Sequence, residues 1–511
     1  MKSGLKIGLT TIFLAAAISL YLHTISIADF AAQHAEVVSH SQQTGHLSTN
    51  GKLIEAFYSY GIVFIQILGV KGSNLLTFPF LVWPYVAILF TTSYQLSNNY
   101  KIAGSIVFLH FVSGINGTNK LFYWPHGMGA VLFLCVITLL IIFARNFDHY
   151  RRIAPAFTII MTTLMFTSYN WSVIGLSSIL ALAISIGTLY HWHPDIVSER
   201  TKIISMRMLL PVIAISIILI TRISEFIYTT AVPMVLRVHE ISSISKFLGG
   251  WLGANTLPEE LSEIYLVRPE VLTYLSIFKY IIVGLVLSSF GIMMLRRLQN
   301  RKLHLLDFLI SSFIVGTGVF ITLRLTIGSI PIPWLHFPTI LCLAYCWRLQ
   351  IGEKIWKRVK IRRVFVVIAL GGLLLQAPLF YAANAEADLI NRTDGLDDYK
   401  VASSFIGEYL DDPIYSTQKP RYLLSMYLTE KFGESGKKPP TRVMQSEDVI
   451  NIREHNNIEK GSFVINYEWN HVVLGNYISL ESWRSSEERI NSHPGVNKVY
   501  VSEETYIYIS K

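Results

Sequence analysis

Long apolar runs recur along most of the chain, and they constrain its fold more than any other feature. Taking roughly 20 apolar residues as the length that crosses a bilayer, we expect about eleven membrane helices. They lie near residues 5–27, 75–95, 102–116, 127–144, 153–168, 171–190, 208–229, 271–295, 304–323, 330–347 and 364–383. Of the 511 residues, 52% are hydrophobic and 15% are charged, which excludes a soluble globular protein of this length. The sequence therefore predicts an α-helical polytopic membrane protein.

The net charge of +9 is explained by membrane topology, and nucleic acid is not an expected partner. Basic residues gather in four short loops at 145–152, 200–207, 296–302 and 354–363. The positive-inside rule places these loops and the amino terminus in the cytoplasm. We therefore expect a multi-pass plasma-membrane protein whose first span is uncleaved. Its outer face would carry the first loop (28–58), a large loop (229–270), all residues after 383 and three glycosylation sequons, at Asn116, Asn170 and Asn391.

The apolar stretch from Leu53 to Val70 leaves one alternative open. Gly61, Gln66 and Gly69 interrupt it, as is typical of a re-entrant or interfacial helix. If the stretch spans the membrane, every later orientation is reversed.

The composition changes after Ala383, which divides the chain into a membrane domain (1–383) and an extracytoplasmic domain (384–511). Hydrophobic periodicity predicts helices at 399–410 and 421–432, strands at 413–417 and 462–467, and a hairpin over 497–509. About 120 residues of this kind can bury a core of their own. We predict a small α/β domain here.

Ionisable side chains inside membrane spans are costly and mark functional sites. On the predicted topology Arg222, Lys279 and Arg324 all lie toward the outer ends of their spans. Arginine and lysine bind phosphate, so these three residues are candidate ligands of a lipid phosphate. The alternatives are a helical pair between Arg222 and Glu225, and snorkelling of the other two side chains to the headgroups.

Asp29 follows directly on the first apolar run, where a membrane helix enters water. An ionised carboxylate there could act as a general base on an acceptor hydroxyl, or cap a helix that begins at Phe30. Helical spacing places His34 on a face that points toward membrane or cavity, together with Phe30, Val37, Val38 and Ser41. His34 joins Asp29 as a candidate catalytic residue, and the alternative is an ordinary hydrogen-bonded histidine.

Metal and cofactor signatures are not found in the sequence. His34, His40 and His46 are six residues apart, a spacing that does not bring side chains together on one helix. Acid pairs that would hold a divalent cation are also missing from the first loop. We therefore predict no cofactor and no metal ligand. Gly127 and Gly129 lack the context of a dinucleotide fingerprint and are predicted to be close-packing positions.

The opening of the chain resembles that of polytopic GT-C glycosyltransferases, particularly prokaryotic and archaeal ones. The resemblance rests on Asp29, on His34 and on a helix closing in Thr44-Gly45-His46. Looser matches are LFYWPHGMGAVLFL, the late-span Arg324 in ITLRLTIGSIPIPWL, and the tail segments FVINYEW and VNKVYVSEETYIYIS. The resemblance implies that a sugar is moved from a polyprenyl-phosphate donor to a glycan, lipid or protein acceptor at the outer membrane face. It also implies that Asp29 is the base.

Two other functions fit the same pattern. A transporter or flippase would use the intramembrane charges to line a pathway, and it would show polar groups on both sides of the midplane. A non-enzymatic scaffold would bind a partner through its outer domain, and Asp29 would then be replaceable. The outward crowding of the candidate residues favours the transferase.

Overall fold

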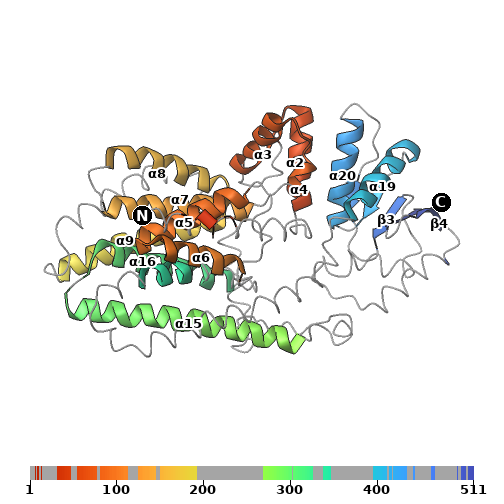
Figure 1. Cartoon of the computed structure of the whole chain (residues 1–511). Helices are drawn as coiled ribbons and strands as arrows, with labels where there is room; N and C mark the ends of the chain where they lie inside the picture. Colours follow the sequence, from red (N-terminus) through yellow and green to blue (C-terminus); the bar gives the residue numbers. More distant parts are fainter. Residues whose placement is uncertain are drawn as a thin grey trace.

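The computed structural model is a helical bundle joined to a mixed α/β unit by a layer of short helices (Figure 1). It describes residues 6, 9, 10, 13, 31–47, 55–77, 81–112, 125–145, 150–192, 269–301, 303–325, 338–346, 395–410, 414–416, 418–433, 441–443, 462–466, 492, 496–501 and 505–510. Asp29, Arg222, the predicted spans at 208–229 and 364–383, and nearly all of the first span and of the loop at 229–270 lie outside these residues.

The bundle consists of long apolar helices that pack on one another. They are α5 (Val82–Ser97), α6 (Tyr100–Val112), α7 (Pro125–Arg145), α8 (Tyr150–Met165), α9 (Tyr169–Trp192), α15 (Pro269–Gln299) and α16 (Leu305–Leu325), with a further helical segment at 338–346. In the centre the ring of Phe133 lies 4.8 Å from that of Trp171 and 5.9 Å from that of Phe313. The core therefore joins α7, α9 and α16.

Close helix packing in the bundle depends on small residues. A Cβ at Gly129 would overlap Trp171 and Ser168, and one at Gly316 would overlap the backbone of Ser178. Such contacts let membrane helices approach closely. The predicted packing role of Gly129 is confirmed.

Among the described residues, three helices are long and apolar enough to cross a membrane: Pro125–Arg145, Asn170–Trp192 and Leu305–Thr322. They match the predicted spans at 127–144, 171–190 and 304–323, and the chain is a multi-pass membrane protein. The total of about eleven spans stays a prediction. The predicted span at 75–95 is wrong in its bounds, because α4 (Asn74–Thr77) ends there and α5 begins at Val82.

The layer beside the bundle contains α2 (Ala31–Thr44), α3 (Glu55–Leu68) and α4. α3 has 14 residues, which at 1.5 Å each give about 21 Å, well short of a roughly 30 Å hydrocarbon core. It ends at Gly69, whose φ of 64° is the left-handed conformation of a helix terminus. These dimensions favour the interfacial alternative for the stretch from Leu53 to Val70.

The carboxyl-terminal unit is a five-stranded sheet with two helices. Its elements are α19 (Gly395–Tyr409), β1 (Ile414–Ser416), α20 (Gln418–Phe432), β2 (Thr441–Val443), β3 (Ser462–Asn466), β4 (Val496–Val501) and β5 (Thr505–Ser510). The strand order is β2-β1-β3-β5-β4. β1 pairs in parallel with β2 and β3, whereas β5 runs antiparallel to β3 and β4. The predicted helices and strands are confirmed to within a few residues, and β2 was not predicted.

Candidate functional site

Helix α2 lies next to the candidate base along the chain. It begins at Ala31, two residues after Asp29, and ends at Thr44 before Gly45, whose φ is 71°. The predicted helix that closes in Thr-Gly-His is therefore confirmed. Phe30, the first residue of the predicted face, lies outside the described residues, and the other four side chains, His34, Val37, Val38 and Ser41, are buried.

The His34 side chain packs between α2 and α3. Its Nδ1 lies 3.0 Å from the Tyr58 hydroxyl, and its ring meets Phe57 edge-on at 5.3 Å between centroids. Only 5% of His34 is exposed. Burial, with smaller effects from Glu36 and Tyr422, raises the pKa of Tyr58, so its phenol stays protonated at neutral pH. The protonated phenol can share a hydrogen bond with the imidazole in either tautomer.

Two of the three candidate phosphate ligands lie on helices that meet at one short turn. Lys279 is on α15 and Arg324 on α16, and residues 300–304 join the two helices. Lys279 precedes Gln299 by 20 positions and Arg324 follows Leu305 by 19, so each lies about 30 Å from the turn along its helix. The structure thus places the backbone of both residues on helices, and their role as phosphate ligands stays a prediction.

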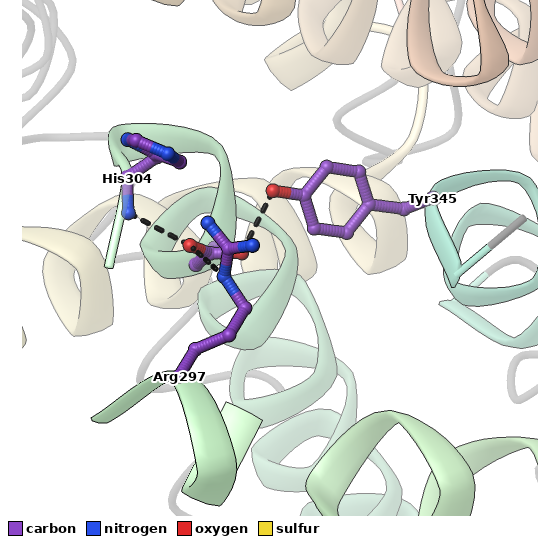
Figure 2. Close-up of polar contacts among 4 residues, drawn as sticks. Arg297, His304 and Tyr345 are labelled. Atoms are coloured by element: carbon purple, nitrogen blue, oxygen red, sulfur yellow. Dashed lines mark hydrogen bonds and ion pairs between the residues drawn. The ribbon is translucent and has the colours of Figure 1, made fainter. Parts of the chain in front are cut away.

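The α15–α16 turn itself is closed around the carboxylate of Asp307 (Figure 2). Arg297 Nε donates to Oδ2 at 3.0 Å, and the His304 backbone N–H donates to the same oxygen at 2.7 Å. The Tyr345 hydroxyl donates to Oδ1 at 2.7 Å. Asp307 is the third residue of α16 and reaches back to the residue before the helix, as in a capping box. Asp307 is 1% exposed, so this is a buried, fully satisfied ion pair.

His110 and His126, two further histidines that the topology places at outer helix ends, also have partners. His110 Nε2 lies 2.7 Å from the Tyr85 hydroxyl. His126 Nδ1 lies 3.3 Å from Ser168 Oγ, and its carbonyl accepts from Trp171 Nε1 at 2.8 Å. Both histidines therefore tie neighbouring helices together.

Asn170, the middle predicted sequon, is 1% exposed and contacts the His126 ring through Nδ2 at 3.3 Å. Its amide nitrogen cannot be reached for glycosylation in the folded chain. Within the described residues, no three His, Cys, Asp or Glu side chains gather closely enough to hold a metal ion.

A second face of α2 contacts the carboxyl-terminal unit, and no pattern in the sequence indicates this contact. Glu430 on α20 accepts from the Ser39 hydroxyl at 3.1 Å, from the Ser73 backbone N–H at 2.6 Å and from the Ser73 hydroxyl at 2.7 Å. Gln43 Nε2 donates to the Thr429 carbonyl at 2.6 Å. The helix that follows the candidate base is thus held by residues nearly 400 positions away.

The arrangement of a helical membrane body, a short-helix layer and an α/β unit has counterparts among solved structures, and this likeness supports the predicted resemblance at the level of the fold. Two of the solved structures that the chain resembles are of ArnT from Cupriavidus metallidurans. ArnT bound to undecaprenyl phosphate gives a TM-score of 0.51 at 10% identity, covering 98% of this chain and 97% of ArnT. Its apo state gives 0.52 at the same identity and coverage. No protein-family model and no curated protein sequence matches the chain.

Proposed function

We propose that the protein is a membrane glycosyltransferase that moves a sugar from a polyprenyl-phosphate donor to an acceptor at the outer membrane face. The observation that carries this proposal is the end-to-end match of the fold to ArnT, one of whose structures contains undecaprenyl phosphate. A bundle of apolar helices beside a short-helix layer suits a lipid-borne donor, because the polyprenyl chain stays in the bilayer while its headgroup enters water. The amino terminus would be cytoplasmic and the carboxyl-terminal unit extracytoplasmic.

The reaction is a single displacement with inversion at the anomeric carbon. Asp29 takes the proton of the acceptor hydroxyl as its oxygen attacks the anomeric carbon. The bond between that carbon and the phosphate oxygen breaks, and polyprenyl phosphate leaves with the bonding electrons. Atoms and charge balance without a cofactor. A general base of this kind contributes about 10²- to 10⁴-fold to the rate.

The leaving phosphate gains negative charge as the bond breaks, so nearby cations stabilise the transition state. We assign this role to Arg324, Lys279 and Arg222. Lys279 and Arg324 lie on two helices that follow each other in the chain, α15 and α16. Donor binding should therefore weaken in Arg324→Ala, and unchanged affinity would remove this residue from the site.

His34 belongs to the candidate catalytic set by sequence. Its ring is buried between Phe57 and Tyr58 and shares a hydrogen bond with the Tyr58 hydroxyl. We propose that His34 acts as a positioning residue, which holds α2 against α3 and so limits where Asp29 can lie.

The first testable prediction concerns Asp29→Asn. Purified protein is mixed with polyprenyl-phosphate-linked hexoses and pentoses and with membrane extracts that supply acceptors, and released polyprenyl phosphate is quantified by mass spectrometry. We expect Asp29→Asn to lower release at least 100-fold, because the amide cannot take the proton. Asp397→Asn, an exposed aspartate at the start of α19, is the matched control and should keep full activity. Full release by Asp29→Asn with normal folding would overturn the mechanism.

A further inference from the structure

Helix α2 is buried on two opposite sides, which is unusual for a helix whose composition is mostly polar. His34, Val37, Val38 and Ser41 face α3 and the end of α7. Ala35, Ser39 and Gln43 recur every four residues and lie on the other side, against α20. At 100° per residue the two sets are centred about 150° apart. α2 is therefore packed between the membrane part of the chain on one side and the carboxyl-terminal unit on the other.

One carboxylate makes most of the polar contacts in this second interface. The two oxygens of Glu430 accept three hydrogen bonds, one from α2 through Ser39 and two from Ser73 in the turn before α4. The two serines belong to different segments, so the carboxylate connects three parts of the fold. Hydrogen bonds to a charged acceptor are stronger than those between neutral groups.

The surroundings of Glu430 leave little room for adjustment. Gly72 packs directly against the Ser39 side chain, and a Cβ at this position would overlap the hydroxyl oxygen and come within 3.1 Å of the Ser39 backbone nitrogen. Ala35 and Leu76 continue the interface by joining the apolar core that α19 and α20 form, where both are fully buried. At the other end of the contact between α2 and α20, a guanidinium nitrogen of Arg421 on α20 lies 3.7 Å from Oε2 of Glu36 on α2.

One residue separates Asp29 from α2, so the Cα atom of Asp29 can lie no more than about 7 Å from that of Ala31. A shift of α2 therefore moves the point from which the chain reaches Asp29. A displacement of about 1 Å at a reacting group can cost about 100-fold in rate.

We propose that Glu430 is a positioning residue for the transfer reaction. By accepting hydrogen bonds from Ser39 and Ser73, Glu430 holds α2 in position. The carboxyl-terminal unit thereby helps to position Asp29, the proposed base near the amino terminus. This role rests on the proposed function, since it needs Asp29 to be the base. It requires that the carboxyl-terminal unit contribute to turnover without contacting the donor.

The test measures kinetics and geometry separately. Turnover and KM for the polyprenyl-phosphate donor are measured in the full-length purified protein. In parallel, nitroxide labels at the exposed positions Gln42 and Val401 report the distance between α2 and α19 by pulsed electron resonance, with the three native cysteines replaced by alanine. The distance measurement needs no substrate.

For Glu430→Ala we expect kcat to fall about 10- to 100-fold, KM to stay within about twofold, and the label distances to broaden. Glu430→Gln keeps one carbonyl oxygen as acceptor and should fall between Glu430→Ala and the wild type. Gly72→Ala disturbs the same contact from the opposite side without touching α20, and should reproduce the loss of turnover. Glu408→Ala is the matched control, because Glu408 is exposed and pairs with Lys431 on the surface of the same unit.

An unchanged kcat in both Glu430→Ala and Gly72→Ala would overturn the proposal, as would a fall in kcat without any change in the label distances. If Glu430→Ala does not fold, Glu430→Gln and Gly72→Ala carry the test. Full activity of Asp29→Asn would overturn the proposed base and this positioning role with it. The label distances would still show whether Glu430 holds α2 in place, so the two failures can be told apart.

Discussion

Two carboxylates, Asp307 in the bundle and Glu430 at the α2–α20 interface, each accept three hydrogen bonds, but they do different work. Asp307 binds partners within 38 positions of itself, one of which is a cation, and only 1% of it is exposed. Glu430 binds donors 357 and 391 positions away, and among the described residues no lysine or arginine forms an ion pair with it.

The difference follows from the location of each group. A buried carboxylate inside a membrane bundle needs a counter-charge and a full set of donors, because water is not available to solvate it. A carboxylate at the edge of a polar unit is half-solvated and can hold two segments together without a cation. The ion pair of Asp307 therefore stabilises the bundle itself, whereas the hydrogen bonds of Glu430 connect separate parts of the chain.

The largest effect that would test this contrast is expected for Asp307→Ala. Removing the carboxylate leaves Arg297 buried without its counter-ion, which typically costs about 3–5 kcal/mol. We expect the free energy of unfolding in detergent to fall by that amount, as followed by denaturant titration. The fraction that remains folded should keep its KM for the donor. A loss below about 1 kcal/mol would show that the α15–α16 turn does not depend on this ion pair.

A smaller effect is expected where glycine packs against a neighbouring helix. Gly129→Ala places a methyl group against Trp171 and Ser168, and overpacking of this kind costs about 1–3 kcal/mol. Gly284 on α15 has nothing within 4 Å of its would-be Cβ, so Gly284→Ala is the control and should be neutral or slightly stabilising. Thermal unfolding of the two variants in the same detergent compares them directly. Equal losses would mean that the α7–α9 contact can relax.

The smallest effect concerns alkaline pH and the α20 side of the comparison. Burial, and to a lesser degree Glu430 and Asp397, raises the pKa of Tyr427 above that of an unfolded tyrosine. The unfolded chain therefore loses its phenolic proton first as the pH rises above about 10, and the folded state loses stability from there upward. One such group contributes at most about 1.4 kcal/mol per pH unit.

Unfolding curves at pH 9, 10 and 11 measure this effect. Tyr427→Phe should flatten the decline relative to the wild type, whereas Tyr409→Phe, which alters an exposed tyrosine on α19, should leave it unchanged. A decline that is identical in all three proteins would assign the alkaline sensitivity to other groups.

Much of the fold could be predicted because its signals are local. Apolar runs located α7, α9 and α16, and alternating residues with intervening turns located the hairpin of β4 and β5. β2 was missed because it has three residues and exists only through its pairing with β1. The bounds of α4 and α5 were missed because the apolar run continues across the break between them.

The candidate site was harder to predict because its contacts are long-range. The spacing of Val37 and Val38 predicted one buried side of α2. The opposite face carries Ala35, Ser39 and Gln43, small and polar residues that are typical of a solvated surface. Only the fold shows that α20 covers Ala35 and Ser39 and accepts a hydrogen bond from Gln43. In the same way, nothing in the sequence pairs His34 with Tyr58, since the two lie on different helices 24 positions apart.

The two-sided burial of α2 has a consequence for how this segment can change. Deleting or inserting one residue between Ala31 and Thr44 turns everything beyond it by about 100°. Such a turn would expose Val37 and Val38 and remove Ser39 from Glu430 at the same time. Substitutions at the exposed Gln42 change neither face. The number of residues in α2 is therefore more constrained than their identity. We expect a chimera that carries the first loop of another protein to fold only if this number is kept.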